Sequence, residues 1–472
     1  MQLGIDLWVP TIPPSHDAIG EYTATLAQTL AKSVPVRILT STETSPTDDD
    51  AVEVHRLFDR GGRNDGRRSR GRRKSQPARF QSLIDFYKTD DQAQRLSNAR
   101  SIRVGIGSGR GDESPKHGLL ASSTTTEIAT TTETDLALRI TQRLILVQYN
   151  PFGWGRRGYA PDLLQTLREI KDVCPGVSVA VMFHERYTTR PGIRPAIMRW
   201  YQKRQFHDLA RFANPCFIAV GNWGRQLESD GITDRAIHLP VGSNLPFSSV
   251  SIAQTRKRLG IPDDAVVCGV FGSAHPSRRT DWIASGLSHL RKRFAGRRAV
   301  VLLSVGSYRI PESMDADADR VIRLGRLPGD QAADAISAMD VLLSPFEDGL
   351  STRRSSAIAT LQQGTVVAST RGPSTDPLFD SIDGSSVFFA GGDGHRDWLD
   401  ALDRWADAFE ANSAGLSESC RQTYRQHFDW TAIAKKIIRS IPTAATLQPS
   451  EATLQPSEAT LQPSEVVAGG RS

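Results

Sequence analysis

The sequence predicts an α/β fold with two doubly wound domains, each built around a parallel β-sheet. Short apolar runs typical of buried strands alternate with stretches whose apolar residues recur at helical spacing. The alternation occurs in two separate series, one on each side of about residue 245. Successive strands joined through helices pair in parallel, because the chain crosses back over the sheet between them. A chain of 472 residues is long enough to fill two such cores.

The first series is expected to form a domain of residues 1–245. It opens with the strand QLGIDLWV and the helix AIGEYTATLAQTLAKS, and later strands include RLILVQYNP, SVAVMFHE and CFIAVGN. Residues of about 59–135 interrupt the series with Arg/Gly-rich and Thr-rich sequence. We expect a long, mostly disordered insertion there, because so polar a segment cannot bury a core, although ARFQSLIDFYK could be helical.

The second series is expected to form a domain of residues 246–415. Its strands are AVVCGVFGSA, AVVLLSVGS, VIRLGRL, VLLSPF and TVVAST, with helices between them. Two helices close the ordered part of the chain. Residues 443–472 contain three tandem copies of ATLQPSE, which is typical of a disordered tail.

Charge and cysteine content restrict the class of protein. The net charge is +6, yet the tract from Arg60 to Lys74 alone carries eight basic residues and one acidic residue. Such a tract attracts nucleic acid or other anionic surfaces, but it contains no aromatic residue, so nucleic acid is not the expected partner.

The four cysteines stand singly, which argues against a disulfide framework or a zinc site. With no visible targeting segment, we expect a cytoplasmic protein.

A candidate anion site follows the strand VLLSPF. There the chain passes through a glycine turn into a helix, and free N–H groups at a helix N-terminus bind phosphate. Arginine pairs add a planar fork suited to the same ligand. The alternative interpretation is an ordinary capped surface helix with two solvated arginines. The candidate residues are Asp348, Gly349, Leu350, Ser351, Arg353, Arg354, Ser355 and Ser356.

This segment resembles the donor-binding segment of the retaining glycosyltransferases of family 4, which have the GT-B fold. Gly349-Leu350 matches the family's turn, and Glu347 stands in for the first acid of its motif. The second acid is replaced by Ala359 or Arg354, depending on the alignment. The resemblance continues at Gly20, His184 and Gly272, where the family approaches the donor phosphates or the reacting sugar. Arg278 or Arg279 occupies the place of the family's lysine, and Ser273 replaces its arginine.

The resemblance implies a GT-B fold of two Rossmann-like domains that bind a nucleotide-sugar donor between them. It implies retaining transfer without a metal or other cofactor, with His184 and Glu347 as catalytic residues. It also implies that the helix of residues 416–442 packs back on the first domain. Nucleotide-sugar epimerisation and a catalytically inactive scaffold remain as alternatives, the second because parts of the donor motif are missing.

The acceptor is expected on the first domain. The loop QYNPFGWGRRGYAP follows a strand and combines aromatic residues with arginines, which suits a glycan or a lipid-linked acceptor. Tyr149, Trp154, Arg156 and Arg157 are the candidates; the alternative is a packed loop. The following basic and aromatic helix, Arg194 to Ala213, could lie on anionic lipid or pack on the sheet. Peripheral contact with the inner face of a membrane is therefore kept as a hypothesis.

Overall fold

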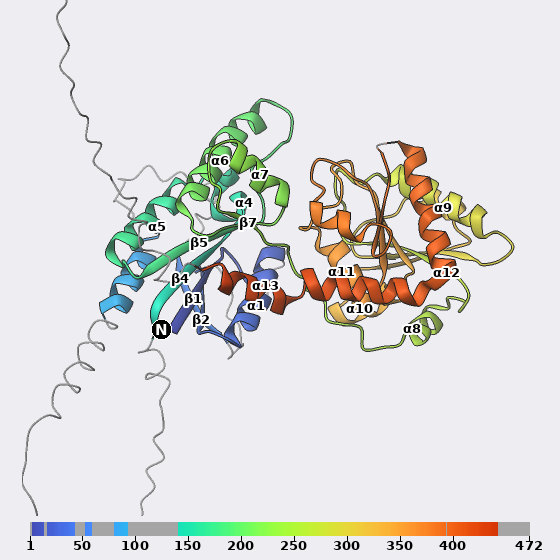
Figure 1. Ribbon diagram of the computed structural model, residues 1–472, viewed down its shortest axis with the longest axis horizontal. Coiled ribbons are helices and arrows are strands. Elements are labelled where there is room, and N and C mark those ends of the chain that lie inside the picture. Colours follow the sequence, from blue (N-terminus) through green and yellow to red (C-terminus); the bar gives the residue numbers. More distant parts are fainter. Residues whose placement is uncertain are drawn as a thin grey trace, which may run out of the picture. The chain divides into compact units, whose positions relative to one another are not determined.

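The computed structural model describes residues 2–13, 17–42, 52–58, 80–92, 140–392 and 394–441. These residues form two parallel β-sheets, each with helices packed against it (Figure 1). The expected α/β fold with two doubly wound domains is confirmed. The Arg/Gly-rich tract and the ATLQPSE repeats lie outside the described residues.

The first sheet has seven strands in the order β3-β2-β1-β4-β5-β6-β7, and all adjacent pairs are parallel. The strands are β1 (Gln2–Trp8), β2 (Val36–Ser41), β3 (Glu53–Phe58), β4 (Ile140–Tyr149), β5 (Val177–Phe183), β6 (Cys216–Ile218) and β7 (Ala236–His238). The helices are α1 (Ala18–Ala31), α4 (Pro151–Trp154), α5 (Pro161–Val173), α6 (Ile193–Phe212) and α7 (Gly221–Ser229), with a 3₁₀ turn at Arg156–Gly158.

The second sheet has six parallel strands in the order β10-β9-β8-β11-β12-β13. The strands are β8 (Val266–Phe271), β9 (Val300–Val305), β10 (Arg320–Gly325), β11 (Val341–Ser344), β12 (Val366–Ser369) and β13 (Val387–Phe389). The helices are α8 (Ile252–Leu259), α9 (Thr280–Phe294), α10 (Gly329–Ser337), α11 (Ser355–Gln363), α12 (His395–His427) and α13 (Trp430–Arg439), with 3₁₀ turns at Glu312–Ala316 and Pro377–Ile382.

Both faces of the first sheet are buried, which explains why its strands read as nearly continuous apolar runs. Alternate residues of β4 point to opposite faces: Leu144 and Leu146 pack with α1, while Ile145 and Val147 pack in a second cluster with α5 and α6. The strand period of two thus divides one apolar run between two cores.

A helix of residues 81–92 lies inside the stretch that we expected to be mostly disordered. Its Tyr87 hydroxyl donates a 2.6 Å hydrogen bond to the fully buried Asp6 of β1. Arg37 and Arg143 also pair with Asp6, at 2.9 and 2.8 Å, and these charges lower its pKa although burial alone would raise it. The helix is therefore part of the first core, held there by a compensated buried charge.

The two last helices connect the domains. The α12 helix runs along the second domain, and α13 contacts α1 of the first (Figure 1). Trp430 of α13 packs 5.0 Å from the ring of Tyr22, and its indole N–H donates to the carbonyl of Ser243 at 2.7 Å.

Candidate functional site

The strand orders locate the site. Each sheet has one topological switch point, where the strand order reverses. It lies between β1 and β4 in the first sheet and between β8 and β11 in the second. Ligands of doubly wound proteins bind beyond the carboxyl ends of the strands at such a reversal. The loops that follow β1, β5, β8 and β11 carry most of the residues expected from the sequence to form the site.

His184 follows β5 and is buried, with 7% of its surface exposed. Its Nε2 lies 2.8 Å from the Gln148 side-chain oxygen, so the arrangement requires the tautomer with a proton on Nε2. Tyr22 packs edge-on against the ring at 4.7 Å. Burial lowers the pKa of His184 to about 3. The imidazole is therefore neutral near pH 7, and it can position a hydroxyl through Nδ1 but does not supply a proton as an imidazolium.

Gly20 lies in the first turn of α1, where the helix packs closely on the loop after β1. A Cβ atom at this position would lie 2.6 Å from the Thr11 carbonyl oxygen. Asp17 caps the helix by accepting from the Ile19 N–H, and Thr11 donates to its other oxygen. A glycine here thus brings the α1 N-terminus close to the end of β1.

The loop after β11 is fixed by Arg354 and by a glycine. Arg354 stacks on Phe346, 3.5 Å from the ring centre, and pairs with Asp348. Burial lowers its pKa to about 10, so it remains a cation near pH 7. Gly349 has a φ of 80°, and a Cβ atom there would lie 2.5 Å from the Gly372 nitrogen, so the loops after β11 and β12 interlock. Leu350 is fully buried beneath them.

Arg278 is the strongest anion-binding candidate. It is 9% exposed and lies between Tyr308 and Phe346, 4.8 and 5.0 Å from their ring centres. Nη2 donates to the Phe271 carbonyl, whereas Nε and Nη1 are buried without any partner. An uncompensated buried guanidinium is costly, and a bound anion would satisfy both nitrogens. Arg279 next to it stacks on Trp282 at 4.2 Å and has an unpartnered Nε.

The N-terminus of α11 adjoins this cluster. No side chain caps the helix, whose first residue is Ser355. The nearest atoms to a Cβ built at Gly272 belong to Ser356, at 3.4 Å, so the end of β8 lies beside the start of α11. The buried Ser351 hydroxyl has no partner. Together these groups form a cationic edge with spare N–H and O–H donors, which is the arrangement that binds phosphate.

Arg353 joins this edge to the first domain. Its guanidinium lies 3.6 Å from Glu185 and faces Trp223, 5.7 Å from the ring. It lines a hollow of about 160 Å³ together with His184 and Tyr22. It also lines a cavity of about 690 Å³, which is bounded by Glu185, the loop before α6 and Asp348. The predicted residues of the two domains therefore meet around Arg353.

A buried carboxylate that we did not predict links the same loops. Asp376 is fully buried and accepts hydrogen bonds from the Thr352 N–H and hydroxyl, both at 2.7 Å, and from the Gly221 N–H. His238 contacts the Thr352 hydroxyl at 2.7 Å. Gly221 and His238 belong to the first domain, so Asp376 anchors the α11 loop to it. Asp376 follows β12, and that position beyond a strand's carboxyl end was the signal available in the sequence.

Several expected residues lie elsewhere. Tyr149 is 1% exposed against Phe183, and Trp154 is fully buried, with its N–H on the Gln148 carbonyl. Neither ring is exposed, which favours the packed-loop interpretation for these two residues. Arg156 and Arg157 are exposed on the loop. Glu347 is exposed and lines neither cavity around Arg353.

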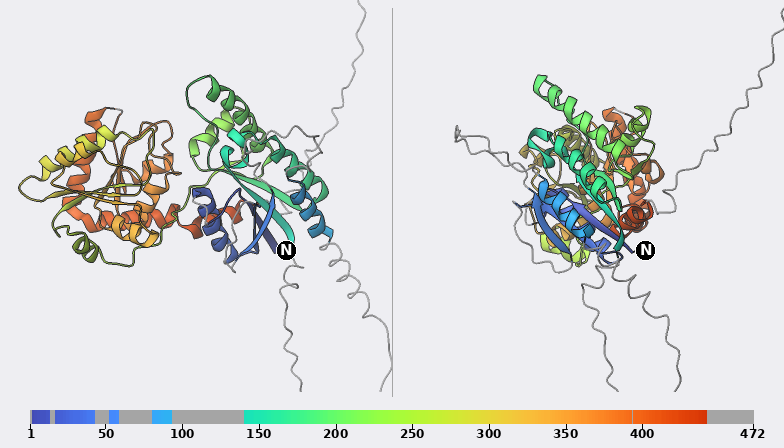
Figure 2. Two further views of the ribbon diagram at one scale, coloured as in Figure 1. Left: turned by 180° about the vertical axis from the view of Figure 1, so that it is seen from behind. Right: turned by 90° about the vertical axis from the view of Figure 1, so that its left-hand side faces the viewer.

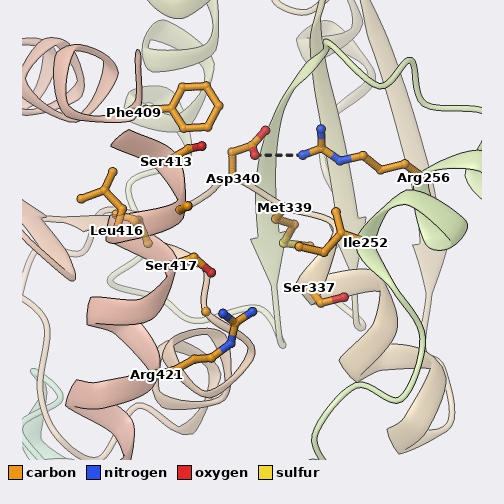
Figure 3. A pocket seen from close by; sticks show the side chains of 13 residues that line it. Ile252, Arg256, Ser337, Met339, Asp340, Phe409, Ser413, Leu416, Ser417 and Arg421 are labelled. Carbon is orange, nitrogen blue, oxygen red and sulfur yellow. Dashed lines mark hydrogen bonds and ion pairs between the residues drawn. The ribbon is translucent and has the colours of Figure 1, made fainter. Parts of the chain in front are cut away.

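A further cavity of about 300 Å³ lies at the opposite, amino-end edge of the second sheet (Figure 3). Arg256 there pairs with Asp340 at 2.8 Å, and its other nitrogens donate to the carbonyls of Ala338 and Ala265. In contrast to Arg278, this buried arginine is satisfied by the protein itself. It serves below as a control position.

No group of three or more His, Cys, Asp or Glu side chains is placed to hold a metal within the described ranges. The acidic run Asp315–Asp319 is engaged in ion pairs and hydrogen bonds, among them Asp315 with Arg323 and Asp319 with Arg291. No helix in the described part of the chain is both long and apolar enough to cross a membrane.

Two doubly wound sheets with their carboxyl-end loops converging on one site define the GT-B architecture. Solved structures of glycosyltransferases share it. Sucrose-phosphate synthase from Thermosynechococcus elongatus is 14% identical with a TM-score of 0.55, over 93% of this chain and 98% of that one. HepE from Anabaena in complex with UDP is 12% identical with a TM-score of 0.56, over 93% and 99%. A glycosyltransferase from Rickettsia africae is 10% identical with a TM-score of 0.56, over 93% and 97%.

At these identities the likeness establishes the fold. No protein-family model matches the sequence, and no curated protein matches it.

Proposed function

We propose that this protein is a glycosyltransferase that takes a sugar from a nucleotide-sugar donor. The observation that carries the proposal is Arg278, a buried guanidinium with two unpartnered nitrogens at the carboxyl edge of the second sheet. HepE, which shares the fold, has been solved in complex with UDP and with UDP-glucose. A donor diphosphate placed against Arg278 and the α11 N-terminus would satisfy the spare donors described above.

The chain's own residues suggest how they would assist the transfer. The cationic edge would stabilise the negative charge that grows on the departing diphosphate. Neutral His184 would position the sugar from the first domain without donating a proton. On the resemblance to family 4 we propose a retaining, metal-independent reaction. Because no carboxylate is assigned as a nucleophile, the protein would orient the reactants and stabilise an ion-pair-like state. The acceptor would be a glycan or a lipid-linked molecule bound in the cavity bordered by Glu185 and the loop before α6.

Thermal unfolding with nucleotides tests the donor site. The protein would be heated with UDP, GDP, ADP and their sugar conjugates, and ligand at about a hundred times its dissociation constant should stabilise it by about 2.7 kcal/mol. Arg278→Met keeps an apolar stem between Tyr308 and Phe346. We expect it to weaken binding of the preferred nucleotide about 10- to 150-fold, which corresponds to about 1.5–3 kcal/mol of lost charge-assisted hydrogen bonding.

Without ligand, the same substitution should have a different effect, which is read from the melting temperature. Replacing an uncompensated buried cation with an apolar chain should leave the melting temperature unchanged or raise it. Arg256→Met, at the cavity of Figure 3, should lower the melting temperature and leave nucleotide binding intact. If Arg278→Met binds every nucleotide as the unaltered protein does, the donor-site proposal fails.

Product analysis distinguishes the alternatives. Turnover of a nucleotide-sugar without any acceptor would indicate an epimerase. Nucleotide binding with no turnover against any acceptor would indicate a scaffold that has kept the fold, in agreement with the missing second acid of the motif.

A further inference from the structure

The outward side of α6 carries a stripe of large apolar side chains. Ile193, Ile197 and Trp200 are 83%, 59% and 70% exposed. Their spacing of four and three residues places them on one face of the helix. The opposite face is buried in the first core through Phe206 and Leu209. In all views α6 lies at the periphery of the first domain (Figures 1 and 2).

An exposed aromatic residue from a second segment adjoins this stripe. Tyr159, in the segment after β4, is 57% exposed. The ring of Tyr159 packs 5.3 Å from that of Tyr201, the neighbour of Trp200. Exposed apolar side chains occur singly on most proteins, whereas a contiguous group of this kind marks an interaction surface. We call these four residues the α6 face: Tyr159, Ile193, Ile197 and Trp200.

Cations border the α6 face. The helix itself contains five basic residues against one acidic residue, Asp208, and among the five is Arg204, which is 74% exposed and lies 3.8 Å from Asp208. Arg190 and Arg194 are exposed beside the apolar stripe, and neither has an acidic partner among the described residues. Arg156 and Arg157 are exposed on the adjoining loop. A helix with aromatic and aliphatic residues on one face and arginines beside them suits the interface of an anionic bilayer.

We propose that the α6 face docks on the surface of an anionic phospholipid bilayer. Ile193, Ile197 and Trp200 enter the boundary between headgroups and acyl chains, and the flanking arginines contact lipid phosphates. Charge argues against a second copy as the occupant, because a two-fold contact would bring the arginines of both copies together. The α6 helix is amphipathic and lies along the membrane rather than through it.

Flotation of the full chain with vesicles tests the docking. We expect binding to phosphatidylcholine vesicles that contain phosphatidylglycerol, and little binding to phosphatidylcholine alone. The triple variant I193S/I197S/W200S should lose at least about tenfold in vesicle affinity, because it removes the buried apolar area. The control V173S/I252S removes exposed apolar side chains outside the α6 face and should bind normally. Residues 60–74 are present in every variant, so they do not account for a difference between them.

A charge series completes the test. R190Q/R194Q/R204Q should reduce affinity for the anionic vesicles about a hundredfold, at about fivefold for each cation. The control R168Q/R326Q/R396Q removes three exposed arginines located elsewhere and should have a much smaller effect. Equal binding by the triple serine variant, or equal binding to both vesicle types, would overturn the proposal. So would a dimer in sedimentation that the serine variant abolishes, since the face would then join two copies.

The two proposals fail separately. The triple serine variant should show the same thermal shift with nucleotide as the unaltered protein, and Arg278→Met should float normally. Loss of one readout without the other identifies which proposal is at fault.

Discussion

The carboxyl-end edges of the two sheets carry different kinds of polar group. On the first sheet the central group is His184, which burial keeps neutral, with the ring of Tyr22 against it. On the second sheet the central group is Arg278, which remains a buried cation with spare N–H donors. Burial disfavours the charged form of both groups. The imidazole avoids that cost because it loses its proton and becomes neutral. A guanidinium keeps its charge, so its burial requires an anion nearby.

Under the proposed function, this contrast would place the donor phosphates at the second sheet, where charge is uncompensated, and the neutral sugar at the first. The aromatic rings of Tyr308 and Phe346 offset part of the cost of burying the Arg278 guanidinium.

Gly349→Ala should disrupt the cationic edge most. The alanine would have a φ near 80°, and its Cβ would overlap the Thr375 hydroxyl and the Gly372 nitrogen, at 2.2 and 2.5 Å. We expect a loss of about 4 kcal/mol in unfolding free energy, from left-handed strain and steric overlap together, and loss of nucleotide binding. Chemical denaturation measures the first effect and calorimetric titration the second.

Gly384→Ala is the matched control. Gly384 has a similar φ of 83°, with nothing within 4 Å of an added Cβ. It should therefore cost only the strain of about 1–2 kcal/mol and leave nucleotide binding intact. Equal losses in the two variants would show that the interlocking of the loops is unimportant.

Because His184 is buried as a neutral imidazole, the unfolding free energy should depend on pH. The pKa of His184 is about 3 in the folded protein and near 6.5 when unfolded. Its stabilising contribution is complete above about pH 6.5 and is lost as pH falls toward 3, because the unfolded chain then binds a proton that the folded protein excludes. At pH 4.5 the loss should be about 2.7 kcal/mol.

His184→Asn removes this titrating group. Denaturation curves of the variant should therefore fall less steeply between about pH 6.5 and 4.5, and the difference between the two proteins isolates His184 from other groups. Parallel curves would show that His184 is accessible and protonated in the folded state, which would remove the contrast between the edges.

Asp376→Asn should loosen the connection between the edges. The substitution keeps the size of the side chain but places an NH₂ group where two N–H donors and a hydroxyl now meet carboxylate oxygens. We expect a loss of about 2 kcal/mol, the cost of leaving a buried donor unpaired. Denaturation followed by the fluorescence of the first and second domains should show them unfolding less cooperatively. A cooperative transition at the original midpoint would contradict the anchor.

The sequence was sufficient for the fold because strand and helix periods are local signals. The run around Leu144 to Val147 predicted a strand, and the structure shows it shared between two cores. The helix of residues 81–92 was seen only as a helical stretch within low-complexity sequence. Its place in the core depends on Asp6, Arg37 and Arg143, which are distant in the sequence and meet only through the sheet pairing.

The site was less predictable, because burial decides what a polar or aromatic residue does. Tyr149 and Trp154 have the composition of a sugar-binding loop, yet both rings lie in the core. Arg353 and Arg354 are adjacent and looked equivalent. The structure pairs Arg354 internally with Asp348 and leaves Arg353 at the cavities, a difference set by which way each side chain leaves the loop.

The different environments of Arg353 and Arg354 lead to the prediction with the smallest effect on binding. Arg353→Gln should weaken nucleotide binding about fivefold, or about 1 kcal/mol, because a partly exposed cation attracts phosphate through solvent. The melting temperature should barely change, since its contact with Glu185 is long and partly exposed. Arg354→Gln should instead lower the melting temperature, because it loses the Asp348 pair and the stacking on Phe346. Titration with nucleotide at two salt concentrations distinguishes the two variants. Nucleotide affinity should depend less on salt in Arg353→Gln. If Arg354→Gln alone weakened binding at unchanged stability, Arg354 would be the ligand-contacting cation and Arg353 a surface charge.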